Sequence, residues 1–336
     1  MKKYLNYIFM IVLMGVTIFV LFRNTSVSNL YSLFEHTNFT YILIACFMMI
    51  LFWTMDAAIL RELLQGILGS KIKLKVFNIT MIGQYYAMIT PFAGGAQPAQ
   101  LYYMNKHKVP LGKATAILLN KYVIYEGVVT IYSLILYFLH IKSYSDISRA
   151  VTSFINIGFL VHIVGVTAII LLIYFPRMVE VIVRWFLRLG KRLRIVKDLD
   201  TKLRRFQNFM SEYRSSLIII INNKLLLLKV IIYTFIQLTV FFTVSYFVYR
   251  ALNLNIYPIL EVISLQAILY IAVSFIPTPG TLGASEAGYY TLFAAMFPTK
   301  ALLTYSLLLW RGITFYFNLV VSGIFSFVFY IRDKKS

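Results

Sequence analysis

Long apolar runs, separated by short and mostly basic segments, dominate the pattern of this chain. A helix needs about 20 apolar residues to cross a bilayer. Runs of this length occupy residues 4–22, 40–60, 114–139, 153–175, 225–249 and 301–330. The pattern therefore predicts an all-α polytopic membrane protein with six full spans.

Two further hydrophobic stretches, at 76–104 and 258–297, are each interrupted by prolines and glycines. Lipid offers no partner to the unpaired peptide groups of non-helical backbone, so such breaks persist only beside protein or a water-filled cavity. The interrupting residues are Pro91, Gly94, Gly95 and Pro98 in the first stretch and Pro277, Pro279, Gly280 and Gly283 in the second. We predict that each stretch is a re-entrant hairpin with these residues at its tip. Close helix packing alone is the alternative, because small residues also permit it.

The basic residues decide the topology, because Lys and Arg are enriched in cytoplasmic loops. If the first terminus is inside and each hairpin returns to the side it came from, every basic cluster falls inside. The loop cations left outside are then Arg23, Lys142, Arg149, Arg250 and Lys300. The distribution predicts a multi-pass protein of the cell membrane whose N- and C-termini are cytoplasmic.

This topology contains an inverted repeat. Repeat A, residues 40–139, holds the hairpin at 76–104, and repeat B, residues 225–330, holds the hairpin at 258–297. The other segments are a first membrane helix with an outer loop at 1–39, a connecting span at 140–175 and a basic amphipathic segment at 176–224. Because inverted repeats place the substrate site where their broken segments meet near the midplane, we expect the two tips to face each other there.

Composition agrees with a membrane protein, since 60% of the residues are hydrophobic and 13% are charged. The net charge of +20 could indicate a nucleic-acid binder, but the basic residues flank apolar runs, so we expect no nucleic-acid partner. Motifs such as HExxH, CxxC and GxSxG do not occur, and Cys46 is the single cysteine. We therefore expect no metal, no cofactor and no catalytic residue. The four histidines, His36, His107, His140 and His162, are assigned to the neighbourhood of the membrane boundaries.

Charged residues inside apolar spans are the candidates for function, because they are costly there. Arg311 lies near the middle of the last span, and Thr314, Asn318 and Ser322 follow on one stripe that should turn inward. Glu286, which closes the second break, is the natural partner of Arg311. This pair either binds a substrate headgroup or only locks the hairpin to the last span.

The first repeat offers a matching set of polar residues. Lys121 lies 30 residues after Pro91 and Arg311 lies 34 residues after Pro277, so with these prolines paired the two stand in about equivalent places and are predicted to be twin cations beside one site. Glu126 lies about 140° from Lys121 around the same helix and should reach a different partner. Gln97, at the first break, completes the candidate substrate-binding residues. Asp56 is given less weight, because it is assigned to the inner end of its span.

The segment at 176–224 interleaves arginines and lysines with large apolar residues. It is predicted to form amphipathic helices on the inner leaflet. A cytoplasmic linker whose charge only fixes the topology is the alternative.

At residues 90–100, 277–286 and 311–316, together with Gly323, the chain resembles the flippase-like membrane region of the lysylphosphatidylglycerol synthase family, also called the multiple peptide resistance factor family. The resemblance covers nearly the whole chain. In its second motif this family usually has two adjacent glycines, where this chain has Gly280 and Thr281.

The resemblance implies a membrane domain that moves a lipid, such as aminoacylated phosphatidylglycerol, between leaflets. Full-length members add a C-terminal domain that transfers the amino acid from aminoacyl-tRNA, whereas this chain ends at Ser336 directly after its last predicted span. We therefore expect a lipid translocase whose partner is an anionic or aminoacylated membrane phospholipid. The membrane component of a lipid-modifying transferase, or a scaffold for a separate synthase, is the alternative. A homo-oligomer is also left open.

Overall fold

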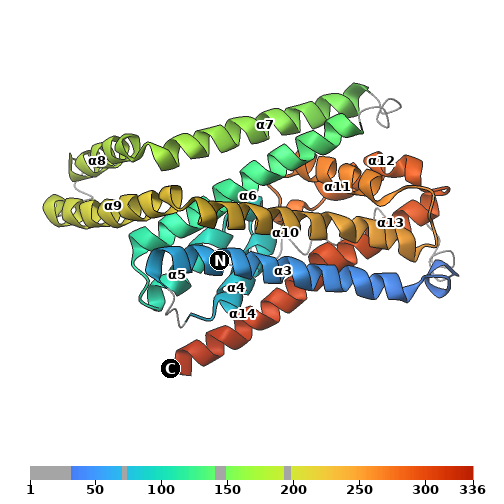
Figure 1. Ribbon diagram of the computed structural model, residues 1–336, viewed down its shortest axis with the longest axis horizontal. Coiled ribbons are helices and arrows are strands. Elements are labelled where there is room, and N and C mark those ends of the chain that lie inside the picture. The colour runs from blue at the N-terminus through green and yellow to red at the C-terminus, as the bar shows by residue number, and fades with distance from the viewer. Residues whose placement is uncertain (1–31, 70–73, 141–148, 193–197, 336) are drawn as a thin grey trace.

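The computed structural model of the protein describes residues 32–69, 74–140, 149–192 and 198–335, and the regular elements in these ranges are all helical (Figure 1). Five helices in these ranges are long and apolar enough to cross a membrane. They are Phe39–Leu68, Leu111–Leu139, Thr152–Leu171, Lys224–Ala251 and Lys300–Arg332. They coincide with five of the predicted spans, and the remaining prediction, 4–22, lies outside the described residues.

Two long helices, α3 (Phe39–Leu68) and α10 (Lys224–Ala251), pack along each other in opposite directions. At one end the amide of Asn38 donates a hydrogen bond to the carbonyl oxygen of Ala251 at 2.8 Å. At the other end Lys229 Nζ lies 3.6 Å from Glu62 Oε2. The corresponding spans of the two predicted repeats are therefore antiparallel.

Two helical hairpins pack against the long helices, α4 on α3 and α11 on α10. The first consists of α4 (Val76–Ile89), the 3₁₀ turn η1 (Pro91–Ala93) and α5 (Ala96–Lys106). The second consists of α11 (Ile259–Val273), the 3₁₀ turn η3 (Pro279–Thr281) and α12 (Ala284–Leu292). The first hairpin comes from the left end of the bundle and the second from the right end, and their turns η1 and η3 contact each other (Figure 1).

Two further helices, α6 (Leu111–Leu139) and α7 (Arg149–Tyr174), pack against α11. The basic segment forms α8 (Pro176–Arg192) and α9 (Leu199–Asn222), of which α9 packs on α6. Arg214 of α9 contacts Glu180 of α8 at 2.6 Å. On α8 a set of large apolar side chains is left exposed: Met178, Val181, Ile182, Trp185 and Phe186. The predicted amphipathic helices are thus present.

The last span is one long rod built from α13 (Lys300–Arg311), the π-helical turn η5 (Gly312–Phe317) and α14 (Asn318–Lys335). The wide turn begins directly after Arg311, and π turns within α-helices occur often at functional sites. The predicted inward stripe is confirmed, because Arg311, Thr314, Asn318 and Ser322 are all buried.

Basic residues gather at one end of the bundle. The end of α5, the helices α8 and α9 and the C-terminal end of α14 all lie toward the left in Figure 1. Arg250 and Lys300 lie at the opposite end, where α10 ends and α13 begins. The described basic segments thus share one end of the bundle, and which side of the membrane this end faces stays a prediction.

Candidate functional site

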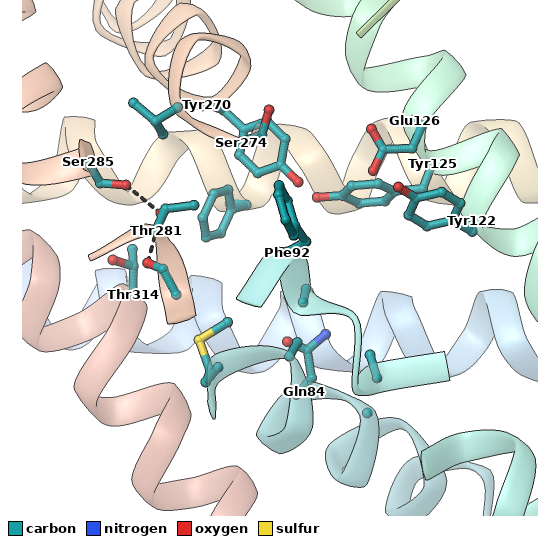
Figure 2. A pocket seen from close by; sticks show the side chains of 18 of the residues that line it. Gln84, Phe92, Tyr122, Tyr125, Glu126, Tyr270, Ser274, Thr281, Ser285 and Thr314 are labelled. Carbon is teal, nitrogen blue, oxygen red and sulfur yellow. Dashed lines mark hydrogen bonds between the residues drawn. The ribbon is translucent and has the colours of Figure 1, made fainter. Parts of the chain in front are cut away.

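A cavity of about 600 Å³ lies where the two hairpin turns meet. Side chains of α3, α4, α6, α7, α10, α11 and the last span line it, together with both turns. Figure 2 shows Phe92 of η1 in the middle of the view, with Tyr122, Tyr125 and Glu126 on one side and Thr281 and Ser285 on the other. The cavity therefore belongs to both halves of the chain.

The two turns have the same backbone conformation. Phe92 and Ala93 have φ of 55° and 54°, and Gly280 and Thr281 have φ of 57° and 54°. The amide of Ala93 donates to the Thr90 carbonyl at 3.2 Å, as that of Thr281 does to the Thr278 carbonyl at 3.1 Å. These two hydrogen bonds make Thr90-Pro91 and Thr278-Pro279 structurally equivalent.

This match corrects the predicted register of the repeats. The sequence prediction paired Pro91 with Pro277, whereas the structure pairs Pro91 with Pro279. The signal was available, because both turns read Thr-Pro followed, after three residues, by Gly-Ala: residues 90–96 and 278–284. Lys121 and Arg311 then stand in more nearly equivalent places than the first register gave.

The turns hold backbone that L-residues rarely adopt. Positive φ is costly for Phe92 and Thr281, and such strain persists only where the surroundings impose it. At Gly280 a side chain is also excluded by space, since an added Cβ would lie 2.1 Å from Phe315 Cε2. The equivalent position in the first turn is Phe92, which points its ring into the cavity (Figure 2).

The predicted pair of Arg311 and Glu286 is confirmed as a contact. Arg311 Nε lies 2.7 Å from Glu286 Oε1, and both side chains are only 8% exposed. The guanidinium also donates to the carbonyl oxygens of Gly280 and Thr281, at 3.3 Å each. Glu286 in turn accepts from the amide of Gly283 at 2.6 Å. Arg311 lines the cavity, while Glu286 lies behind the turn and is not among the lining residues.

Lys121 is paired with an acid to which the sequence analysis gave little weight. Its Nζ lies 2.7 Å from Oδ1 of Asp56, which is buried on α3 rather than snorkelling to an interface. Gln84 Nε2 donates to the other carboxylate oxygen of Asp56 at 3.1 Å, and Asn318 Nδ2 donates to Gln84 Oε1 at 3.4 Å. This chain of contacts links α6, α3, α4 and α14. Asp56 and Gln84 both line the cavity and were missed as site residues.

Glu126 reaches a different partner from Lys121, as predicted, and that partner is His162. Nδ1 of His162 lies 3.3 Å from Glu126 Oε2, and Nε2 hydrogen-bonds Ser274 Oγ. The assignment of His162 to a membrane boundary is wrong, because it is buried within the apolar helix α7 and lines the cavity. The sequence signal was its position inside the run 153–175.

Of the other candidate site residues, some line the cavity and the rest lie in or beside the turns η1 and η3. Gln97, Asn318 and Gly280 line the cavity. Seven others form the turns or flank them and are not lining residues: Pro91, Gly94, Gly95, Pro98, Pro277, Pro279 and Gly283. The twin cations Lys121 and Arg311 both line the cavity, each with its own acid.

Several polar groups of the cavity wall have no hydrogen-bond partner within the described residues. They are Gln237 Oε1, Trp310 Nε1 and Asn318 Oδ1. Buried polar groups are nearly always satisfied, so unpaired ones call for water or a ligand. With the charge pairs, they give the cavity donors, acceptors and both signs of charge inside apolar walls.

This geometry defines a class of protein. It is an all-helical membrane protein in which two helical hairpins, each with a Pro/Gly break at its turn, meet at a charged cavity. Residues 7–322 match the family of the lysylphosphatidylglycerol synthase TM region, and the chain belongs to this family. It is also similar to a UPF0104 membrane protein of Archaeoglobus fulgidus, with 24% identity over 326 residues, 91% of each chain.

Proposed function

We propose that this protein moves a phospholipid between the two leaflets, with the headgroup passing through the cavity between η1 and η3. The observation that carries the proposal is the meeting of two hairpins from opposite ends at a cavity with charged and unpaired polar groups. Broken helices that meet in this way form the substrate sites of transporters built from inverted repeats.

The proposed membrane arrangement follows from the charges. The end that carries α8, α9 and the end of α14 is cytoplasmic, so α4–α5 is a re-entrant hairpin from the cytoplasmic side and α11–α12 one from the outer side. With the span at 4–22, this gives six full spans in the cell membrane and both termini inside. The repeats at 40–139 and 225–330 are then upside-down relative to each other.

The size and charge of the cavity fit a lipid headgroup. About 600 Å³ is the volume of a small-molecule pocket. It would hold a headgroup while the acyl chains stay in the bilayer. Lys121 and Arg311 would contact the phosphate, and Glu126 would face a cationic group such as an aminoacyl amine. An anionic or aminoacylated phospholipid is therefore the proposed substrate.

The test is a leaflet assay in reconstituted vesicles. Phosphatidylglycerol with a fluorescent headgroup is quenched from outside by dithionite, and lipid movement exposes the inner pool. We expect the protein to raise the quenched fraction above one half and Arg311→Ala to reduce the rate. Arg250→Ala, at the C-terminal end of α10 and outside the cavity lining, is the matched control and should keep the rate. An Arg311→Ala and Glu286→Gln pair that both move lipid at the normal rate would contradict the site.

A second candidate is the membrane component of a lipid-modifying transferase, or a scaffold for a separate synthase. The family description concerns a synthase, and α8 leaves an apolar face open on a basic helix. Aminoacylated lipid formed by the purified protein, or synthase binding that is lost in Phe186→Glu, would support it. Neither result is expected if lipid movement is the whole function.

A further inference from the structure

Three polar side chains join α6, α7 and α11 at the cavity wall. His162 of α7 lies between Glu126 of α6, at 3.3 Å, and Ser274, the C-cap of α11. All three line the cavity. Building on the proposed lipid movement, we propose that His162 is a proton-binding site that couples lipid movement to a proton gradient across the membrane.

The hydrogen bonds of this cluster are complete in both charge states of the imidazole. Glu126 only accepts when ionised, so Nδ1 of His162 carries a proton in either state. In the neutral state the Ser274 hydroxyl donates to Nε2. In the charged state Nε2 donates to Ser274 Oγ, whose hydroxyl turns to the Ile271 carbonyl oxygen, 3.2 Å away. Histidine is the side chain that changes charge between about pH 5 and 8.

Two groups of negative charge lie beside the His162 ring. The Glu126 carboxylate faces the ring, and the C-terminal end of α11 carries the negative end of its helix dipole. The other titratable groups on the packed faces are the phenols of Tyr122 and Tyr125 on α6 and Tyr270 on α11. The cations and acids across the cavity are already paired with each other: Lys121 with Asp56 and Arg311 with Glu286.

The same order of groups, acid, histidine and serine, occurs in serine hydrolases. In those enzymes the serine oxygen attacks a carbonyl and an oxyanion develops beside it, which requires positive dipoles. Here Ser274 sits at a helix C-terminus, whose dipole repels an oxyanion. That dipole favours an imidazolium, so the cluster fits proton binding better than ester cleavage.

Protonation acts next to the second turn. Gly158 lets α7 approach α11, because an added Cβ would lie 2.9 Å from Ala272 Cα. His162 follows one helical turn later on the same face and so reaches Ser274. Three residues beyond Ser274 the chain enters Pro277 and then η3, whose carbonyls bind Arg311. A proton on His162 therefore changes the hydrogen bonds of Ser274, at the end of α11, the helix that leads into η3.

The coupling predicts a measurable asymmetry. One pH unit is a tenfold ratio in proton activity, so one proton exchanged per lipid supports about tenfold accumulation of lipid in one leaflet. A passive pathway gives equal leaflets whatever the pH gradient. The sign of the accumulation tells whether lipid and proton move together or in exchange.

Proton binding is tested first without any transport. In protein labelled with ¹⁵N-histidine and held in lipid nanodiscs, one ring that His162→Gln removes should gain a second proton between pH 8 and pH 5. Ser274→Ala leaves the His162 imidazole in place but removes the acceptor for its second N–H. The doubly protonated fraction of His162 at pH 6 should therefore fall. A His162 ring with one proton over this whole range overturns the proposal, whether or not lipid moves.

Coupling is then tested in vesicles with an imposed gradient of one pH unit and headgroup-labelled phosphatidylglycerol. We expect unequal leaflets with the natural protein and equal leaflets with His162→Gln. His36→Gln, at an exposed histidine, is the matched control and should keep the asymmetry. Lipid that moves without asymmetry overturns the coupling alone, and no lipid movement at all overturns the proposed function. Release of fatty acid that requires Ser274 would show ester cleavage instead and also overturn the proposal.

Discussion

Lys121 Nζ and Asp56 Oδ1 lie 2.7 Å apart and join α6 to α3. The two side chains are 14% and 8% exposed. Taking one partner away leaves the other charge without compensation at low dielectric, which is far costlier than replacing both by neutral groups.

We therefore expect Lys121→Gln or Asp56→Asn alone to lower the free energy of unfolding by about 3–5 kcal/mol. The double substitution should cost less than the sum of the two, since it leaves no unpaired charge. Thermal unfolding in detergent measures all three. Lys229→Gln, which removes the more exposed pair with Glu62, is the control and should cost about 0–1 kcal/mol. If the double variant recovers stability but not lipid movement, the pair serves transport as well as folding.

Arg311→Lys tests whether lipid movement depends on the positive charge of Arg311 or on the planar shape of its guanidinium. Lysine keeps the charge that faces Glu286 but cannot reach two carbonyls in one plane as the guanidinium does. Loss of one charge-assisted hydrogen bond costs about 1.5–3 kcal/mol. We expect lipid movement to slow by roughly tenfold or more, since each 1.4 kcal/mol is a factor of ten. Arg250→Lys should leave the rate unchanged, and equal rates for both variants would show that charge alone is enough.

Alanine substitutions at Gly280 and Gly283 separate two costs to stability: backbone strain at positive φ and the lack of space for a Cβ. Both have positive φ, at +57° and +83°, but a Cβ at Gly283 meets nothing within 4 Å, whereas one at Gly280 overlaps Phe315. We expect Gly280→Ala to destabilise the protein by more than about 1 kcal/mol and by more than Gly283→Ala does. Phe315→Leu should restore part of the Gly280→Ala loss in a double variant. Unfolding midpoints that are equal for the two alanine variants would contradict the contact.

Trp185 reports where α8 lies. It is 58% exposed on the apolar face, while the other tryptophans, Trp53 and Trp310, are buried. If α8 rests on the membrane, brominated lipids should quench emission that disappears in Trp185→Phe. If α8 is only a linker, bromolipids should remove the same amount of emission from the natural protein and from Trp185→Phe. Anionic lipid should strengthen the quenching, because α8 is rich in arginine.

Five of the six predicted spans and the two helix breaks could be predicted because hydrophobic length and Pro-Gly breaks act locally. The contact of Glu286 with Arg311 was also accessible, since a buried cation needs an acid and both lie in the same repeat. Asp56 and His162 were not found, because their roles depend on which helices pack together. The pattern of apolar and polar residues does not show that α3 brings an acid to α6, or that α7 packs against both α6 and α11. The register of the turns was missed although its motif was visible.

The contact between η1 and η3 has a consequence during synthesis. Because a chain is made at about 5–20 residues per second, the roughly 190 residues between Pro91 and the end of η3 take about 10–40 s. Throughout that time the first turn is complete but its partner turn is not. Its strained backbone has nothing from the second hairpin to hold it, so the membrane-inserted first half waits with an open, polar tip. A nascent chain that stalls before η3 is therefore distinguishable from a finished one by this exposed turn.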